Sequence, residues 1–281
     1  MGTEQKLRTN KNKTEQLSDL YILSNPLDTK DKITIDIKDI TDYAFCSYYY
    51  KLKREDDNIN LRNLYDISLH KTFYSYLLSL QENKLDSTLE FLKYKWGEEW
   101  IKSKSRNDIL MSSMKRDSYE SKRKRGIDAI FTFNDIIAND KQFPIIIGHK
   151  YQIEILPNII LTGTFEYIRE VTINNKKVIQ LIQFLSESFR TLTKISQLYN
   201  IGLIASSYAF KEQFNVNFFQ SLSVDIEKKK VFSNVYSDKE YNILKDTVKN
   251  TVICLQNDIC IISPDTKCFS CEYRDICMSK L

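Results

Sequence analysis

Glycine, proline and histidine are scarce in this sequence of 281 residues, which contains 6 glycines, 4 prolines and 2 histidines. So little glycine and proline disfavours collagen-like chains, elastic linkers and small turn-rich barrels. Any mechanism that needs a histidine has only His70 and His149 to use. No apolar run approaches the roughly 18 residues that cross a bilayer, so we expect no membrane partner. The first residues are polar, with no apolar segment behind them, so we also expect no secretory signal.

The composition is that of an ordinary globular protein, with 42% hydrophobic and 28% charged residues. A net charge of +4 neither requires nor excludes a nucleic-acid partner. Six cysteines without a secretory signal favour a cytoplasmic protein with reduced thiols or bound metal over a disulfide scaffold.

Hydrophobic periodicity predicts helices at both ends of the chain and strands in its middle. Helical spacing begins near residue 36 and continues through Cys46 to about residue 55; it returns over 69–81 and over most of 86–137. From about residue 143 the segments become β-branched and alternating, with turn signals at Pro157-Asn158 and Asn174-Asn175. Three successive strands are expected there, followed by a helix, two strands, a last helix and a cysteine-rich tail. This order predicts one α/β or α+β domain with a helical insertion.

The tail contains the pattern C-x2-C-x5-C, formed by Cys268, Cys271 and Cys277. Two thiolates separated by two residues can chelate one metal centre from a tight turn, and a third can close the same side. Three ligands leave a zinc ion or a cubane cluster one ligand short, and Cys46 is the candidate for the fourth. The alternative is that Cys46 is a buried small hydrophobe in an aromatic helix. Two further cysteines, Cys254 and Cys260, lie outside the pattern and are expected to be packing residues.

The order of several segments resembles that of a known nuclease family: DITDYAFCSYYYKLKRE, LHKTF, YQIEI, LTGTFEYI, VIQLIQF, SQLYNIGLI and CFSCEYRDIC. The chain is similar to the RecB-type branch of the PD-(D/E)XK nucleases, which includes AddB-type nuclease domains and CRISPR-associated adaptation nucleases. The resemblance covers about residues 36–281. It implies an α/β restriction-endonuclease-like core with a mixed central sheet, a helical N-terminal insertion and termini stapled by an iron–sulfur cluster.

Within that resemblance, residues 1–33 form a polar flexible arm and residues 34–281 form the RecB-like domain. The domain includes a helical insertion at about 86–140 and the cysteine-rich tail at 254–281. The resemblance also implies that a [4Fe–4S] cluster is ligated by four cysteines, namely Cys46, Cys268, Cys271 and Cys277. Zinc is the alternative metal. The cluster's role would be structural, because full cysteine ligation leaves no open position for a substrate.

The resemblance assigns two remnants of a catalytic site that would hold Mg²⁺ or Mn²⁺ if the protein is active. Glu166, in the sequence Gly163-Thr-Phe-Glu166, stands where the family carries the acid of a G-x-x-D strand. His70 matches a further metal ligand of this branch. Both residues also have ordinary structural interpretations, as a satisfied polar residue on a helix and a glutamate bonded to its neighbours.

The third predicted strand departs from the family's acid-x-lysine pattern. Gln183 stands in place of the acid and Leu185 in place of the lysine. An amide oxygen can coordinate a hard cation but brings no negative charge, and leucine stabilises no charge at all. Lys194 is a conceivable migrated lysine, and Gln197 fits the first position of the family's Q-x3-Y motif although Ile201 replaces the tyrosine. The sequence therefore predicts a catalytically inactive nuclease fold.

Two basic segments are candidates for nucleic-acid contact. The densest run lies in the helical insertion and contains Lys115, Arg116, Lys122, Arg123, Lys124 and Arg125. It is interpreted either as a phosphate-binding surface or as a solvated helix face. The tyrosines at 48–50, beside Lys51, Lys53 and Arg54, could stack on bases or belong to the core.

Three functions remain open from the sequence. The first is a non-catalytic, iron–sulfur-containing protein that binds nucleic acid, with DNA the expected partner, or serves as a subunit of a nucleic-acid-processing complex. The second is an active metal-dependent DNA nuclease with an atypical third strand. The third is a protein–protein scaffold without nucleic acid.

Overall fold

The computed structural model describes residues 32–55, 61–82, 88–105, 116–138, 144–185, 200–216, 219–262, 268, 271 and 273–279. Nearly all of the predicted N-terminal arm lies outside these residues, as do Lys115, Lys194 and Gln197. Within the described ranges, no helix is long and apolar enough to cross a membrane.

The chain forms a mixed α/β structure around a mixed six-stranded sheet with the order β1-β3-β4-β5-β6, in which β2 also pairs with β3. β1 pairs with β3, and β4 with β5, in parallel; β3–β4 and β5–β6 are antiparallel. The prediction of an α/β fold with a mixed sheet is therefore confirmed. The strands are β1 (Ile33–Asp36), β2 (Pro144–Leu156), β3 (Ile159–Ile173), β4 (Lys176–Leu185), β5 (Gln220–Asp225) and β6 (Lys230–Asn234).

Asparagines close the two hairpins that join β2, β3 and β4. Asn158 has a φ of 64°, and Asn174 and Asn175 have φ values of 50° and 61°. Asparagine tolerates this left-handed region better than most residues, and two successive positive φ values are typical of a tight hairpin turn. The predicted three successive strands and both turn signals are confirmed.

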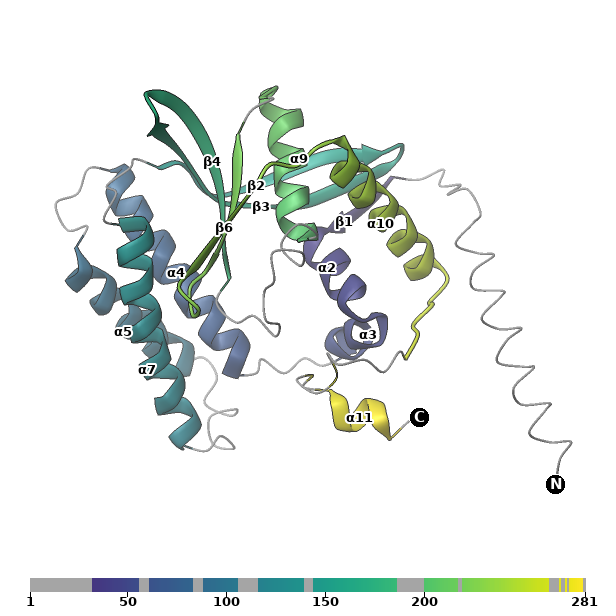
Figure 1. Cartoon of the computed structure of the whole chain (residues 1–281). Helices are drawn as coiled ribbons and strands as arrows, with labels where there is room; N and C mark the ends of the chain where they lie inside the picture. Colours follow the sequence, from purple (N-terminus) through teal and green to yellow (C-terminus); the bar gives the residue numbers. More distant parts are fainter. Residues whose placement is uncertain are drawn as a thin grey trace, which may run out of the picture. The chain divides into compact units, whose positions relative to one another are not determined.

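In chain order, helices lie between β1 and β2, between β4 and β5, and after β6 (Figure 1). The region predicted to be helical between 86 and 137 contains α5, α7 and a short π-helix, η1. The helices are α2 (Ile37–Phe45), α3 (Ser47–Glu55), α4 (Leu61–Gln81), α5 (Leu89–Ser105), α7 (Arg116–Phe133), η1 (Asn134–Ala138), α9 (Ile201–Phe214), α10 (Asp238–Gln256) and α11 (Arg274–Met278).

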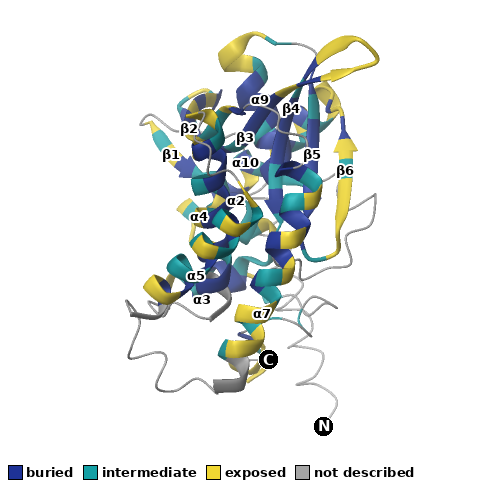
Figure 2. Ribbon diagram, turned by 90° about the vertical axis from the view of Figure 1, so that its left-hand side faces the viewer, coloured by how far each residue is buried: buried dark blue, intermediate teal, exposed yellow. Residues whose placement is uncertain are grey.

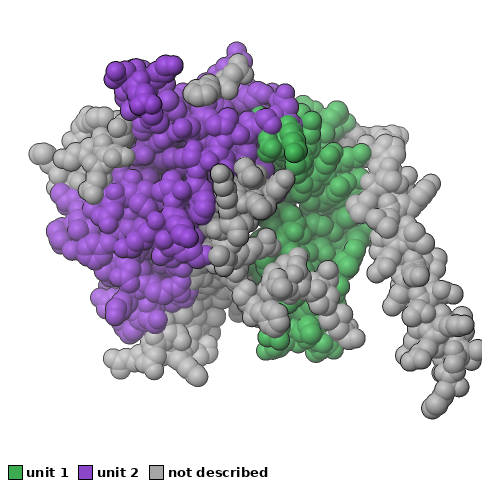
Figure 3. All heavy atoms as spheres, viewed as in Figure 1, with its two compact units in different colours: residues 1–55, 152–162, 239–281 green, residues 56–151, 163–238 purple. Residues whose placement is uncertain are grey.

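The chain divides into two compact units, coloured separately in Figure 3. Unit 1 comprises the described residues within 1–55, 152–162 and 239–281. Unit 2 comprises the described residues within 56–151 and 163–238.

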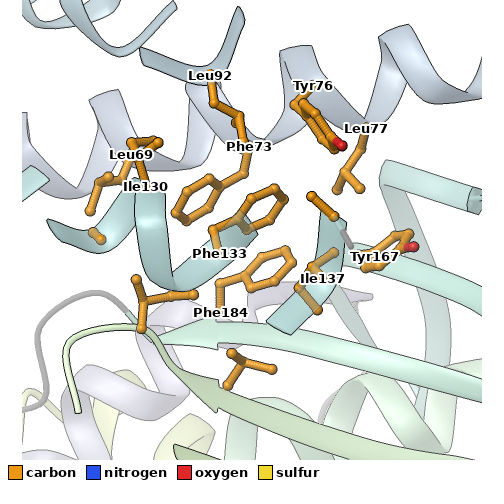
Figure 4. Close-up of a cluster of buried hydrophobic side chains, with 14 of the residues drawn as sticks. Leu69, Phe73, Tyr76, Leu77, Leu92, Ile130, Phe133, Ile137, Tyr167 and Phe184 are labelled. Carbon is orange, nitrogen blue, oxygen red and sulfur yellow. The ribbon is translucent and has the colours of Figure 1, made fainter. Parts of the chain in front are cut away.

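Unit 2 is built on an aromatic core between α4, α5, α7 and one face of the sheet. The rings of Phe73 and Phe133 stack with centroids 4.1 Å apart, and Phe184 of β4 packs against both (Figure 4). Trp96 of α5 is buried beside them, and a Cβ atom on Gly126 of α7 would overlap its ring. The apolar residues of α4 that gave the helical spacing over 69–81 therefore face this core. Within the sheet, β5 is largely buried and β6 is largely exposed (Figure 2).

β1 was not predicted from the sequence. Its four residues, Ile33–Asp36, pair in parallel with Ile159–Thr162 of β3, more than a hundred positions away. So short a strand carries little periodic signal, and its partner is far away in the chain. Asp36 ends the strand and caps the next helix, because its carboxylate accepts the N–H of Lys38 at 2.8 Å.

Candidate functional site

The helical segment predicted through Cys46 is broken at that cysteine. Cys46 has an extended backbone, with φ −167° and ψ 120°, between α2 and α3. Its N–H still donates to the carbonyl of Asp42 at 3.1 Å, and its carbonyl accepts the N–H of Tyr50 at 3.0 Å. The uninterrupted helix is therefore wrong at this point, since one extended residue ends the first helix and begins the second.

A segment following α10 is hydrogen-bonded to both sides of this break. The Tyr43 hydroxyl donates to the carbonyl of Ile259 at 2.6 Å, and the Ile261 N–H donates to the Ser47 hydroxyl at 2.9 Å. These bonds join residues more than 200 positions apart in the chain. They bring the approach to the C-terminal cysteines beside Cys46.

The end of α10 sets the direction of that segment. Asp258 adopts a left-handed φ of 50°, its N–H donates to the carbonyl of Leu255 at 3.3 Å, and the Ile259 N–H donates to the carbonyl of Cys254 at 2.8 Å. This pair of bonds is the Schellman motif, which ends a helix and reverses the chain.

The C-terminal cysteines lie on a turn and a short helix. The Cys271 N–H donates to the carbonyl of Cys268 at 3.3 Å, a bond between residues three apart that is typical of the turn expected from the spacing. Cys277 lies on α11, where its N–H donates to the carbonyl of Tyr273 at 2.9 Å.

All four cysteines of the predicted ligand set line one cavity in unit 1. The other lining residues are mostly aromatic or aliphatic, including Tyr48, Tyr49, Leu52 and Tyr273, which are buried. Tyr49 and Tyr273 pack with ring centroids 5.5 Å apart. The cavity therefore offers thiols as its distinctive ligand groups, and thiolates suit zinc or an iron–sulfur cluster.

The four thiols line one cavity, but their positions do not have the geometry of a metal site. All six cysteines belong to the described residues, and none of them forms a disulfide. Among the described residues, no three histidine, cysteine or acidic side chains converge closely enough to hold a metal ion. The residues thus fit a cluster in the type and number of their ligands, while the ligation itself stays a prediction.

The two remaining cysteines lie outside this cavity. Cys254 is buried on α10, and Cys260 packs against the aromatic residues around the cavity. Burial raises the pKa of the Cys260 thiol above its usual range.

The two predicted remnants of the catalytic site lie together in unit 2. Nδ1 of His70, on α4, is 4.0 Å from Oε2 of Glu166, on β3. Their side chains are 20% and 18% exposed, so both are reachable from solvent. Asp66, one helical turn before His70, adds a carboxylate oxygen 3.5 Å from its Nε2.

Tyr74, one helical turn after His70, closes this group. Its ring packs edge-on against the imidazole, with centroids 6.0 Å apart. Burial raises the pKa of Tyr74 above its usual value, and the nearby carboxylates of Glu166 and Asp66 raise it further. The phenol therefore stays protonated at neutral pH and can act as a hydrogen-bond donor.

Glu166 is tied to the neighbouring strand. Its Oε2 accepts the backbone N–H of Phe184 at 2.8 Å, just beyond the last paired residues, Tyr167 and Ile182. Extending the antiparallel register by one step sets Glu166 opposite Gln183. Gly163, the first residue of the segment Gly163-Thr-Phe-Glu166, is explained by packing, because a Cβ atom at this position would overlap the Tyr151 hydroxyl.

Gln183 is engaged by an asparagine that sequence reasoning missed. The Asn200 amide donates to Oε1 of Gln183 at 2.9 Å, and its own oxygen caps α9 by accepting the Leu203 N–H at 3.2 Å. Leu185 is half-buried at the end of β4. Gln183 and Leu185, the positions that the resemblance matches to an acid and a lysine, thus carry a neutral amide and an aliphatic side chain.

The basic run on α7 is partly neutralised by neighbouring groups. Arg125 forms an ion pair with Glu227, Lys122 lies over the ring of Tyr65, and Arg123 is 3.6 Å from Glu120. The run therefore includes fixed contacts within unit 2 besides solvated charge. The side chain of Arg116 lies outside the described residues.

The tyrosines beside the second basic segment belong to the core. Tyr48, Tyr49 and Tyr50 are at most 8% exposed. Lys53 lies 2.7 Å from Asp42, and Arg54 donates to the Tyr50 hydroxyl at 3.0 Å. Stacking on bases is therefore not open to these rings in this structure.

Neither the protein-family models nor the curated proteins that we searched gave a match to this chain. The candidate sites consequently rest on the geometry described above. Sequence signals existed for the residues that were missed: Asp66 and Tyr74 lie one helical turn from His70, and Asn200 directly precedes an apolar helix.

Proposed function

We propose that this protein is a catalytically inactive nuclease-fold protein that binds an iron–sulfur cluster and acts as a nucleic-acid-binding or scaffolding subunit of a nucleic-acid-processing complex. It would work inside the cell, where thiols stay reduced. The observation that carries the proposal is the contrast between a cavity lined by four cysteines and a histidine–glutamate pair beside which Gln183 and Leu185 occupy the positions where the resemblance expects an acid and a lysine.

The cysteine cavity supports the binding of a cluster by its chemistry. Cys46, Cys268, Cys271 and Cys277 would be the ligands, and bound metal would tie the α2–α3 break to the C-terminal tail. Joining residues so distant in sequence restricts the unfolded chain and so stabilises the folded one. Zinc remains the alternative occupant.

The environment of Glu166 supports the absence of catalysis. Phosphodiester hydrolysis with a divalent metal needs anionic ligands for the cation and groups that stabilise the developing charge. Glu166 supplies a carboxylate, but Gln183 is neutral and bonded to Asn200, and the side chain of Leu185 cannot donate a hydrogen bond.

The second candidate is an active Mg²⁺- or Mn²⁺-dependent DNA nuclease. The proximity of His70 and Glu166 favours it, because an imidazole and a carboxylate are both groups that bind divalent cations. It would require a substitute for both missing groups.

A cleavage assay separates these candidates. Full-length protein purified without oxygen is incubated with labelled single- and double-stranded DNA and with Mg²⁺ or Mn²⁺. We expect no cleavage, together with DNA binding that weakens as salt increases. Glu166→Ala, purified identically, controls for contaminating nuclease. Cleavage by the wild type that this variant loses would refute inactivity and support the second candidate. If the protein neither cleaves nor binds DNA, the scaffolding role would be the one remaining candidate.

A further inference from the structure

A hollow in unit 2 lies between α7 and the turn that joins β5 to β6. Its volume is about 340 Å³. α7 contributes residues spaced three or four apart, so that one face of the helix lines it. The lining residues are Arg125, Asp128, Ala129 and Thr132 of α7 and Ile226, Glu227, Lys228 and Lys229 of the turn.

The turn is anchored to the helices by a charged network. The Glu227 carboxylate forms an ion pair with Arg125 and accepts the Tyr65 hydroxyl at 3.3 Å. Burial, followed by the charge of Glu227, raises the pKa of Tyr65 above its usual range. The hydroxyl therefore remains a donor, and Glu227 has two partners within the protein.

The same turn is fixed from inside by a buried aspartate. The Asp225 carboxylate is fully buried and accepts the backbone N–H of Lys228 at 3.0 Å. Lys229 adopts a left-handed φ of 54°, and the side chains at 228–230 are all exposed. Three consecutive lysines thus project from a turn whose backbone is held in place.

We propose that this hollow binds phosphate groups of a nucleic-acid backbone, with Lys228 and Lys229 as the principal contacts and Arg125 as a flanking cation. The hollow is lined by three cations and two carboxylates. Arg125 is paired with Glu227, and Nζ of Lys228 lies 3.8 Å from the buried Asp225 carboxylate, which holds this lysine beside the hollow. Lysines held on a fixed turn lose less freedom when they contact a phosphate than lysines on a mobile segment. This inference rests on the proposed function, which it deepens by assigning the binding surface to a hollow whose lining includes neither His70 nor Glu166.

The hollow also contains a group that opposes the proposed ligand. Asp128 is exposed and lines the same hollow, so its negative charge would repel a phosphate. Removing that charge should therefore tighten binding, whereas removing the lysines should weaken it. A general effect of net charge would also change binding in these two directions. A control is therefore needed in which the same number of charges is removed at another place on the protein.

The β3–β4 turn supplies that control. Lys176 and Lys177 are also consecutive exposed lysines in an antiparallel hairpin. The double variants Lys228→Gln/Lys229→Gln and Lys176→Gln/Lys177→Gln change the net charge equally.

The experiment measures binding of mixed-sequence single-stranded and duplex DNA by full-length protein over a series of salt concentrations. Each lost phosphate contact lowers the magnitude of the slope of log affinity against log salt by about 0.7 on single strands and about 0.9 on duplex DNA. For Lys228→Gln/Lys229→Gln, which removes two contacts, we therefore expect a decrease of about 1.4 on single strands and about 1.8 on duplex DNA. Asp128→Asn should bind more tightly, and the control pair should match the wild type. Thermal unfolding checks that each variant is folded.

The outcomes distinguish this inference from the proposed function. If the wild type binds DNA and Lys228→Gln/Lys229→Gln binds it equally well, the site is overturned but the proposed function is not. The same holds if the two double lysine variants weaken binding equally. An absence of DNA binding by the wild type overturns the site together with the nucleic-acid-binding role, and only the scaffolding role would then remain. Unchanged or weaker binding by Asp128→Asn counts against the hollow even if the lysine variant fails to fold.

Discussion

The cysteine cavity of unit 1 and the histidine–glutamate site of unit 2 differ in chemical completeness. Four thiols of the predicted ligand set line a single cavity, whereas only His70 and Glu166 represent the predicted catalytic groups. Gln183, where the resemblance predicts an acid, pairs regularly with Ser223 of β5. A regular strand therefore says little about chemistry, which depends on a few side chains.

The largest effect that would test this contrast is expected from Cys271→Ser. If the four thiols hold a metal centre, the variant should lose bound metal and much of its stability, since structural zinc in small domains contributes about 10 to 16 kcal/mol. Metal content and the urea midpoint measure both changes. Cys260→Ser, which alters a cysteine outside the cavity, should keep its metal; equal losses in the two variants would count against the assignment.

The reverse experiment introduces into unit 2 the acid and the lysine that the resemblance predicts at positions 183 and 185. Gln183→Glu combined with Leu185→Lys should produce Mg²⁺-dependent DNA cleavage at least about 100-fold above the wild type, because it supplies a second carboxylate and a cation. Each single change should do much less. Activity that persists after adding Glu166→Ala would show that the gain does not come from this site.

The aromatic core should separate the two regions in another way. Phe133→Ala removes a fully buried ring that stacks on Phe73, and should cost about 3 to 5 kcal/mol of unfolding free energy. Because the cavity with four cysteines belongs to unit 1, the folded variant should retain its metal. Denaturant unfolding and metal analysis test this, and loss of metal from folded protein would contradict the separation.

The smallest effect is expected at the contact that engages Gln183. Asn200→Ala removes the cap of α9 and should lower the unfolding free energy by about 0.5 to 2 kcal/mol. Asn200→Ser, which can still cap the helix, should recover most of this loss. A serine variant as unstable as the alanine variant would mean that the bond to Gln183, rather than the cap, is the important one.

Local patterns predicted those parts of the fold that depend on neighbouring residues. Alternation and the asparagine turns predicted β2, β3 and β4, and the C-x2-C spacing predicted the turn at Cys268 and Cys271. Parallel pairing of the short β1 with β3 could not be predicted, because it depends on residues more than a hundred positions away.

The candidate sites show the same division. The pairing of His70 with Glu166 followed from the resemblance, and the structure brings them to 4.0 Å. The break at Cys46 is not marked by a strong signal in the sequence, since residues 36–55 contain neither proline nor glycine. It is accompanied by the hydrogen bonds that Tyr43 and Ser47 make to residues 259–261, which periodicity in one segment cannot reveal.

Metal analysis of the full-length protein, purified without oxygen, is the most direct test of the central claim. We predict iron and acid-labile sulfide in equal amounts, at the stoichiometry of one [4Fe–4S] cluster per chain. Protein that is folded yet contains neither iron–sulfur cluster nor zinc would contradict the assignment of a metal centre to the four cysteines.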